Sequence, residues 1–207
     1  MLFLKDISSL LGKEIGCGSE RRCYIKVSDP SRCLKISKKQ DSDQTLREIK
    51  YFEFLQNIGV VASFVPKFYG AFETDDHIGY EQECFLLKEN GGIYDEVFPF
   101  DRYILSHPTE VKKIKLEMMM LKSEMVNKNI ICSDLSASNV LKVRIGEEIN
   151  KIVVIDGYGP SELLPLCQYV KFLGKMKMER QWDKFEKRIR KHFSEAEVIV
   201  AKNQFNN

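Results

Sequence analysis

The chain has 207 residues, of which 43% are hydrophobic and 30% are charged, and its formal net charge is +2. These values are typical of a soluble globular protein, and the near-neutral charge gives no sign of a strongly basic nucleic-acid-binding or membrane-surface protein. No apolar stretch of the sequence approaches the ~18–20 residues that a membrane-spanning helix requires.

The first residues, MLFLKDISSLLGKE, include an acid and several polar side chains early. They do not resemble a signal peptide, so we expect a cytoplasmic protein. The six cysteines show no CxxC spacing, and the three histidines lie far apart. We expect the cysteines to be small apolar thiols, and a zinc site or a histidine-based triad is poorly supported.

The first third of the chain is predicted to form strands and one helix. RCYIKVS (22–28) and RCLKISK (32–38) are strand-like runs separated by Asp29-Pro30-Ser31, a sequence typical of a hairpin turn. Residues 41–57 carry apolar side chains at helical spacing, and Glu48 lies on the flank of that apolar face. Two more strands are expected in residues 64–74 and 79–88, before a glycine break.

Beyond that break the periodicity becomes helical. Residues 109–129 contain an apolar stripe that predicts a long amphipathic helix, with Met119 and Met120 as additional packing residues. A methionine-rich binding surface is the alternative interpretation of this segment. Two short strands follow, separated by a hairpin-like segment at 144–151.

Two helical segments close the chain, and the last has two distinct faces. Its apolar face, which we expect to pack on the C-terminal part, comprises Trp182, Phe185, Ile189 and Phe193. Its other face is basic and comprises Lys184, Lys187, Arg188, Arg190 and Lys191. These cations are typical of a solvated helix face balanced by acids, here Glu179, Asp183, Glu186 and Glu195. A surface for nucleic acid or acidic lipid is the less favoured interpretation.

Residues suited to phosphate chemistry occur in the N-terminal part. Gly16 and Gly18 lie between two strands, where the absence of Cβ allows backbone N–H groups to approach a phosphate. Lys35 is a charge inside an otherwise apolar strand. It is the obvious partner for Glu48, because a carboxylate beside a packed helix face needs a cation or a hydrogen-bond donor.

Residues suited to metal chemistry occur later in the chain. Asp134 and Asn139 stand five positions apart in a small polar loop, and Asp156 follows a strand directly before a glycine. Oxygen ligands at the ends of rigid strands indicate a hard cation and a phosphate.

The order of these residues and their secondary-structure contexts resemble the protein-kinase signature set. The chain also resembles the bacterial YrbL family of kinase-like proteins, the PhoP regulatory network family, over nearly its whole length. The segments that carry this resemblance include REIKYFEFL (47–55), NKNIICSDLSASNVL (127–141) and ERQWDKF (179–185). It implies one kinase-like α+β domain of two lobes, a small β-rich N-lobe at 1–88 and a shortened helical C-lobe at 89–207.

The resemblance implies a site for ATP and Mg²⁺ in the cleft between the lobes. In the N-lobe, Gly16 and Gly18 would cover the phosphates, and Lys35, paired with Glu48, would contact the α- and β-phosphates. The segment LLKENG (86–91) would be the hinge, whose backbone holds adenine; its central residues are Leu87, Lys88 and Glu89.

In the C-lobe, the resemblance implies that Asp134 is the catalytic base and that Asn139 and Asp156 are metal ligands. Several positions depart from the kinase pattern. Cys132-Ser133-Asp134 replaces His-Arg-Asp, Asp156-Gly157-Tyr158 replaces Asp-Phe-Gly, and Arg21 stands at the third glycine position. No long activation segment follows Asp156, so the usual platform for a peptide substrate is missing.

We therefore expect an ATP- and Mg²⁺-dependent phosphotransferase that is not a standard protein kinase. A small molecule or an unusual protein surface is the favoured acceptor. The alternative is a pseudokinase that binds nucleotide and acts as a regulatory module without turnover. Nucleic acid is disfavoured as a partner, and no membrane span is expected.

Overall fold

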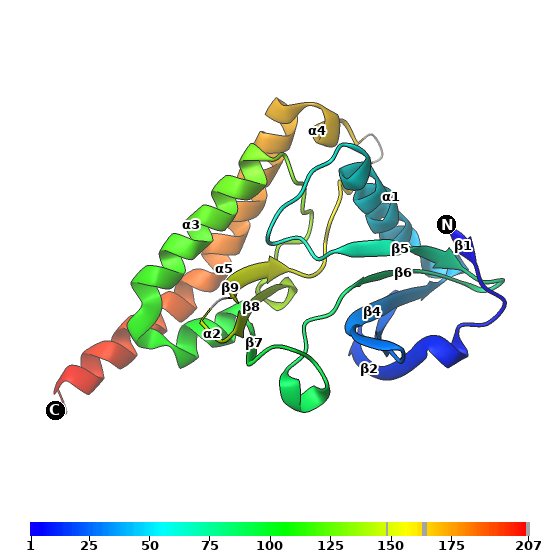
Figure 1. Ribbon diagram of the computed structural model, residues 1–207. Coiled ribbons are helices and arrows are strands. Elements are labelled where there is room, and N and C mark those ends of the chain that lie inside the picture. The colour runs from blue at the N-terminus through cyan, green and yellow to red at the C-terminus, as the bar shows by residue number, and fades with distance from the viewer. Residues whose placement is uncertain (148, 163–164, 206–207) are drawn as a thin grey trace. The chain divides into compact units, whose positions relative to one another are not determined.

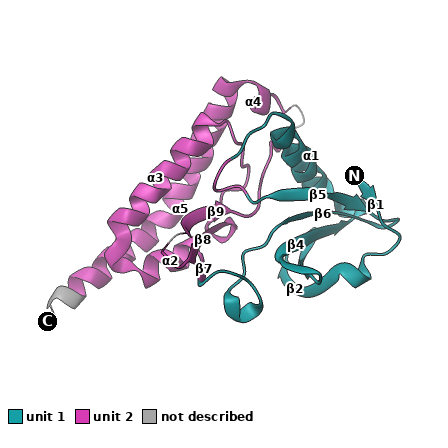
Figure 2. Cartoon of the chain, in the orientation of Figure 1, with its two compact units in different colours: residues 1–61, 66–95 teal, residues 62–65, 96–207 magenta. Residues whose placement is uncertain are grey.

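The computed structural model describes residues 1–147, 149–162 and 165–205, with the side chains of 203–205 left undescribed. Figure 2 colours its two compact units: unit 1 comprises residues 1–61 and 66–95, and unit 2 comprises 62–65 and 96–207. Unit 1 ends at Asp95, and the predicted division into two lobes at residue 88 stays a prediction. The chain turns back after residue 88, where Lys88 N–H donates to the Tyr94 carbonyl at 2.9 Å.

A six-stranded sheet forms the body of unit 1 (Figure 1), in the order β1-β5-β6-β4-β3-β2. Its strands are β1 (Leu2–Phe3), β2 (Leu11–Cys17), β3 (Arg21–Lys26), β4 (Asp29–Lys38), β5 (Phe68–Glu73) and β6 (His77–Glu83). β1 pairs with β5 in parallel, and the other neighbours are antiparallel. The turn between β3 and β4 falls at residues 27–28, not at the predicted Asp29-Pro30-Ser31, because Asp29 already pairs with Lys26.

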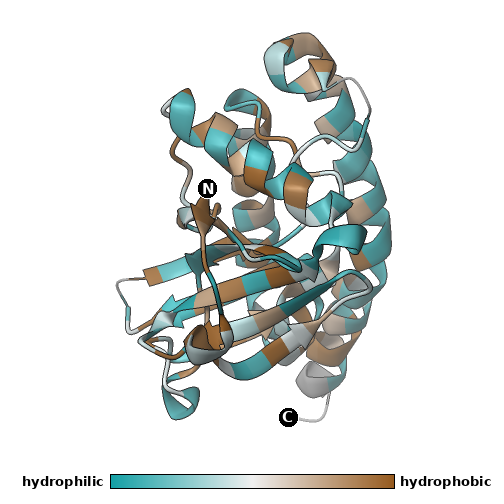
Figure 3. Cartoon of the chain, turned by 90° about the vertical axis from the view of Figure 1, so that its right-hand side faces the viewer, coloured by the Kyte–Doolittle hydropathy of each residue, from teal (hydrophilic) through white to brown (hydrophobic). Residues whose placement is uncertain are grey.

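Helix α1 (Asp43–Asn57) packs on one face of this sheet through Ile49, Phe52 and Leu55, as its helical periodicity predicts. The Phe52 ring stacks on Phe68 of β5 at 5.3 Å between centroids. Leu34 and Ile36 of β4 point to the opposite face and join a second apolar cluster. Figure 3, turned toward the sheet, shows the alternation of apolar and polar residues along its strands.

Unit 2 combines a small sheet with helices. Its strands, in the order β7-β8-β9, are β7 (Glu96–Pro99), β8 (Val140–Ile145) and β9 (Ile149–Val154). Its helices are α2 (Phe100–Ser106), α3 (Val111–Asn127), α4 (Leu166–Tyr169) and α5 (Lys171–Phe205). Strand β7 and helix α2 were not predicted. The hairpin of β8 and β9 was predicted at this place in the sequence. Glu148, which belongs to the predicted hairpin segment, lies outside the described residues.

Helix α5 packs along α2 and α3 (Figure 1). Its predicted apolar face is buried, with Trp182 and Phe185 at 0% exposure. The same packing corrects the prediction for two methionines of α3. Met119 and Met120 are 64% and 63% exposed, because Val111, Ile114, Leu121 and Met125 supply the buried stripe of α3 and the methionine pair lies outside it.

At the level of fold class, the prediction is confirmed: the chain is a mixed α+β protein with a β-rich N-terminal sheet and a helical C-terminal region. All six cysteines are thiols, and four of them are buried. Within the described ranges, no helix combines the length and apolar character needed to cross a membrane.

Candidate functional site

The glycine turn of unit 1 joins β2 to β3. Gly18 N–H donates to the Arg21 carbonyl at 2.7 Å and closes the turn. A Cβ at Gly16 would lie 3.7 Å from Cys23 Cβ, and a Cβ at Gly18 would lie 3.5 Å from the Arg21 carbonyl oxygen. Both are ordinary contacts, so packing within the turn does not require glycine at either position. Gly16 at the end of β2 and Gly18 in the turn are both exposed, and without a Cβ each leaves its backbone open to the predicted contact with phosphate.

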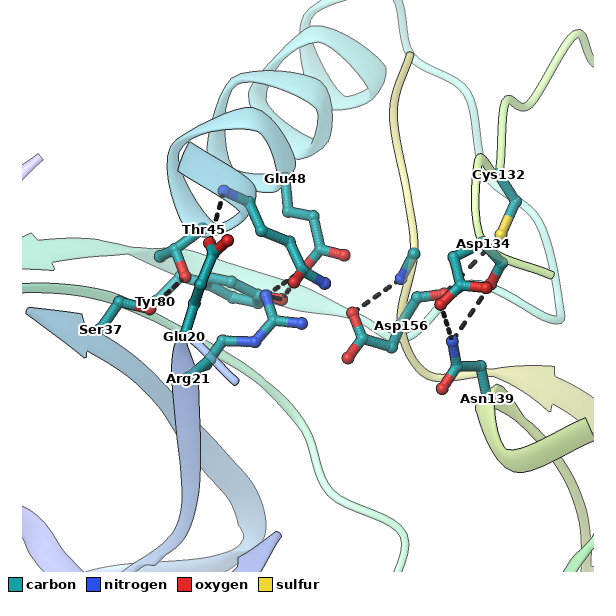
Figure 4. Close-up of polar contacts among 12 residues, drawn as sticks. Glu20, Arg21, Ser37, Thr45, Glu48, Tyr80, Cys132, Asp134, Asn139 and Asp156 are labelled. Atoms are coloured by element: carbon teal, nitrogen blue, oxygen red, sulfur yellow. Dashed lines mark hydrogen bonds and ion pairs between the residues drawn. The ribbon is translucent and has the colours of Figure 1, made fainter. Parts of the chain in front are cut away.

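Glu48 of α1 lies deeper than the helix flank on which it was predicted, at 0% exposure. Its carboxylate accepts a hydrogen bond from Arg21 Nη1 at 2.5 Å and another from the Tyr80 hydroxyl (Figure 4). Arg21 Nη1 also lies 3.2 Å from the Tyr80 hydroxyl oxygen. Three elements, β3, α1 and β6, therefore meet at one buried carboxylate.

Sequence reasoning missed this role of Arg21, which it noted only as a departure from the glycine pattern. The register between β3 and β4 explains why Arg21 reaches Glu48. Arg21 pairs with Ser37 on β4, and the Ser37 hydroxyl bonds to Thr45 of α1 at 2.7 Å. The register thus places Arg21 at the end of the sheet face that α1 covers.

Lys35 belongs to the same neighbourhood. It is 5% exposed, and its Nζ lies 5.8 Å from the centroid of the Tyr80 ring, as does Arg21 Cζ. The adjacent Cys23 thiol has a pKa well above its ordinary value, owing first to the Cys33 thiol and then to burial, so it adds no negative charge there. The ion pair that the structure describes at Glu48 is with Arg21, and a Lys35–Glu48 pair in the nucleotide-bound protein stays a prediction.

The buried pair gives a first testable expectation. Glu48→Gln should lower the free energy of unfolding by ~3 kcal/mol, because it leaves the Arg21 charge buried beside an amide. The double variant Arg21→Met/Glu48→Gln should recover part of that loss, since it removes the stranded charge. Urea denaturation measures both.

The matched control is an exposed ion pair formed by the next residue of β3. Arg22 pairs with Glu14 at 3.1 Å, with side chains 62% and 36% exposed. Glu14→Gln should therefore change the stability little. Equal effects of Glu14→Gln and Glu48→Gln would contradict the structural role assigned to the buried pair.

The predicted hinge, residues 86–91, folds into a tight turn of its own. The carbonyl of Leu87 accepts the N–H groups of Asn90 and Gly92 at 2.9 and 3.0 Å, and the Lys88 N–H is engaged by Tyr94. Lys88 Nζ pairs with Asp95 at 2.7 Å, and Glu89 is exposed. A hinge contact to adenine through the Lys88 N–H therefore requires the Lys88–Tyr94 hydrogen bond to open.

In unit 2, the loop between α3 and β8 carries Asp134 and Asn139. Leu135, buried at 1% exposure, anchors the loop, while Asp134 itself is exposed. Asn139 Nδ2 donates to Asp134 Oδ2 and to the Asp134 carbonyl oxygen, both at 3.1 Å (Figure 4). These bonds orient the Asp134 carboxylate and turn the amide oxygen of Asn139 away from it.

Asp156 follows β9 in a segment that is bonded to this loop. Ile155 N–H donates to the Asn139 carbonyl at 2.8 Å, and Ser133 N–H donates to the Gly157 carbonyl at 2.8 Å. Asp156 Oδ1 accepts the Gly157 N–H at 2.7 Å. The structure thus brings Asp134, Asn139 and Asp156 together in one unit.

Gly157 is required at this junction. Its φ is +85°, and a Cβ there would lie 2.5 Å from the Asp134 carbonyl oxygen. A side chain would force apart the segments that carry Asp134 and Asp156. The Asp-Gly sequence after the strand therefore has a structural reason that the sequence pattern alone did not give.

The predicted donors suit Mg²⁺, because the carboxylate of Asp156 and the amide oxygen of Asn139 are the hard ligands that this cation prefers. In the part of the chain that the structure describes, no three His, Cys, Asp or Glu side chains form a metal cluster. Asp156 and Asn139, the two predicted metal ligands, would therefore hold the cation together with oxygens of a phosphate ligand, as is usual for Mg²⁺. The predicted residues Gly16, Gly18, Lys35, Glu48, Leu87, Lys88 and Glu89 all lie in unit 1.

Comparison with known proteins gives one family and two relatives. The family model described as PhoP regulatory network protein YrbL matches residues 10–190. The "Uncharacterized protein YrbL" of Escherichia coli (strain K12) is 29% identical over 184 residues, which cover 83% of this chain and 82% of the relative. The protein of the same name from Shigella flexneri matches with the same identity and coverage.

Proposed function

The chain belongs to the PhoP regulatory network protein YrbL family, and from this premise we propose that it is a kinase-like, ATP- and Mg²⁺-dependent phosphotransferase. Its proposed acceptor is a small molecule or an unusual protein surface, not the peptide of a standard protein kinase. The observation that supports the proposal most is the junction in unit 2, where Asn139 orients the Asp134 carboxylate and Gly157 connects Asp156 to the same loop.

The proposed roles follow from the positions of the side chains. Asp134 is exposed and its carboxylate is oriented, so it can accept the proton of an acceptor hydroxyl. As that proton moves to Asp134, the acceptor oxygen bonds to the γ-phosphorus, the bond from this phosphorus to the β,γ-bridging oxygen breaks, and ADP leaves. Bound Mg²⁺ would neutralise charge on the phosphates, and Asp156 and Asn139 are the residues proposed to hold it.

The short segment after Asp156 supports an acceptor other than a peptide. Glu162, six positions beyond Asp156, already pairs with Lys177 of α5, with Nζ–O distances of 2.5 and 2.7 Å. Lys177 is 3% exposed, so the pair holds the segment against the helix. Little chain remains between Asp156 and this attachment to form the platform on which a peptide would lie.

The second candidate function is a nucleotide-binding regulatory module without turnover. It is favoured by Cys132-Ser133-Asp134, which lacks the histidine and arginine that precede the catalytic aspartate in typical kinases. Turnover separates the two candidates, whereas nucleotide binding is common to both.

The experiment that tests the shared binding step compares Asp156→Asn with the parent by thermal shift. At ~100 times its Kd, Mg²⁺-ATP should add ~2.7 kcal/mol, which corresponds to roughly 5–10 °C for a chain of this size. Asp156→Asn should lose most of this shift, because the carboxylate that holds the cation is gone. Removing Mg²⁺ from the parent should have the same effect.

The control is Asp183→Asn, which neutralises an exposed acid on α5. It should retain the full shift with Mg²⁺-ATP. A parent protein that shows no shift with ATP or GTP, with or without Mg²⁺, would leave both candidate functions without their ligand.

A further inference from the structure

Large apolar side chains are exposed together where α4 meets the start of α5 (gold and orange in Figure 1). They comprise Leu166, Tyr169, Val170, Phe172, Leu173 and Met176, of which Phe172 is 69% and Tyr169 65% exposed. Leu166, Leu173 and Met176 line one shallow pocket of about 230 Å³, and Arg180 lies at this pocket too. Single exposed apolar residues are ordinary, but six within eleven positions, three of them around one pocket, favour an interaction surface.

A stripe of cations continues from this apolar group along α5. Leu173, Met176, Arg180, Lys184, Lys187 and Lys191 recur at spacings of three and four residues, which places them on one face of the helix. All four cations of the stripe are exposed. The surface is therefore apolar at the start of α5 and cationic along the following turns.

The acids expected to balance these cations are partly engaged elsewhere. Lys122 of α3 pairs with Glu179 at 3.2 Å and with Glu186 at 3.4 Å. Both glutamates therefore lie on the side of α5 that faces α3, away from the stripe. Two acids, Asp183 and Glu195, remain beside the stripe. Its four cations are Arg180, Lys184, Lys187 and Lys191. The four cations of the stripe thus outnumber the two acids beside it, and the stripe has a net positive charge.

We propose that this surface of α4 and α5 binds the anionic surface of a phospholipid membrane. The apolar side chains at residues 166–176 would enter the boundary between headgroups and acyl chains, and the cations of the stripe would contact the headgroup phosphates. The protein lies on the membrane in this arrangement and does not cross it. The inference rests on the surface alone and is independent of the proposed phosphotransferase activity.

The apolar part decides between a membrane and a nucleic acid. Cations and aromatic rings serve both, since phosphates attract cations and bases stack on rings. Leu166, Val170, Leu173 and Met176 are not aromatic, and they gain little against a sugar-phosphate backbone. At a membrane interface the same side chains are buried, and Tyr169 and Phe172 suit the headgroup level.

Flotation of the full chain with vesicles tests this proposal. The protein should bind vesicles that contain phosphatidylglycerol and should not bind vesicles made only of phosphatidylcholine. The binding should weaken as salt is added. Lys184→Gln/Lys187→Gln should lower the partition coefficient by roughly 30-fold, at ~1 kcal/mol per cation. Phe172→Ser should lower it by roughly tenfold to a hundredfold.

The matched control is Lys5→Gln/Lys13→Gln, which removes two exposed cations from unit 1 and changes the net charge equally. It should alter the partition coefficient little, and circular dichroism should be unchanged for every variant. Three results would overturn the proposal: no binding to either kind of vesicle, an equal loss in the control, or stripe-dependent binding to RNA or DNA without vesicle binding.

Discussion

Trp182→Ala is expected to lower the free energy of unfolding by ~3–5 kcal/mol, the usual cost of emptying a core site of this size. Trp182 is at 0% exposure on α5. Its ring meets Phe185 edge-on at 5.3 Å between centroids, and Phe185 stacks on Phe100 of α2 at 6.1 Å. The melting temperature should fall by roughly 6–20 °C. Differential scanning calorimetry measures it.

Trp182→Phe is the matched control for this substitution. Trp182 Nε1 is buried and has no hydrogen-bond partner within the described part of the chain. Phenylalanine keeps a ring in the site and removes that unsatisfied N–H, so it should cost much less than alanine. An alanine variant as stable as the parent would contradict the packing described for α5.

The apolar face of α5 could be predicted because its signal is local. Trp182, Phe185, Ile189 and Phe193 recur at helical spacing, and a helix that places four large apolar residues on one side has to bury them. The same reasoning failed for Met119 and Met120. Their spacing allowed a buried position, but α5 contacts other positions of α3 and leaves these two exposed.

The candidate site was predicted only where its residues are close in sequence or follow a recognisable element. Asp134 and Asn139 are five positions apart, and their hydrogen bond forms within one loop. The bonds from Ile155 to Asn139 and from Ser133 to Gly157 connect segments more than fifteen residues apart. They depend on how β8 and β9 pair, which no local pattern specifies.

The contact of Arg21 with Glu48 was missed for a related reason. The need of Glu48 for a cation could be inferred from its place beside the packed helix face, but the approach of Arg21 depends on side-chain geometry across the sheet. Arg21 approaches the carboxylate from β3 and Tyr80 from β6. Nonlocal pairing of this kind is set by the whole sheet, not by the sequence around Glu48.

Asp134→Asn is expected to cut turnover by roughly 10²–10⁴, the usual contribution of a general base. The affinity for ATP should be unchanged. The reason is that an asparagine at position 134 can still accept the hydrogen bond from Asn139 Nδ2 through its own side-chain oxygen, which preserves the loop. Asp183→Asn, on the exposed surface of α5, is the control for loss of one negative charge.

The measurement that tests the proposed phosphotransferase most directly is ADP release by the parent and by Asp134→Asn, with ATP affinity determined by calorimetry on the same samples. Small hydroxyl compounds and candidate proteins serve as acceptors, in the presence of Mg²⁺. The account predicts equal ATP affinities and ADP release that is roughly 10²–10⁴ higher in the parent. A parent that binds ATP but releases ADP no faster than Asp134→Asn, with every acceptor, would contradict it and identify a nucleotide-binding regulator.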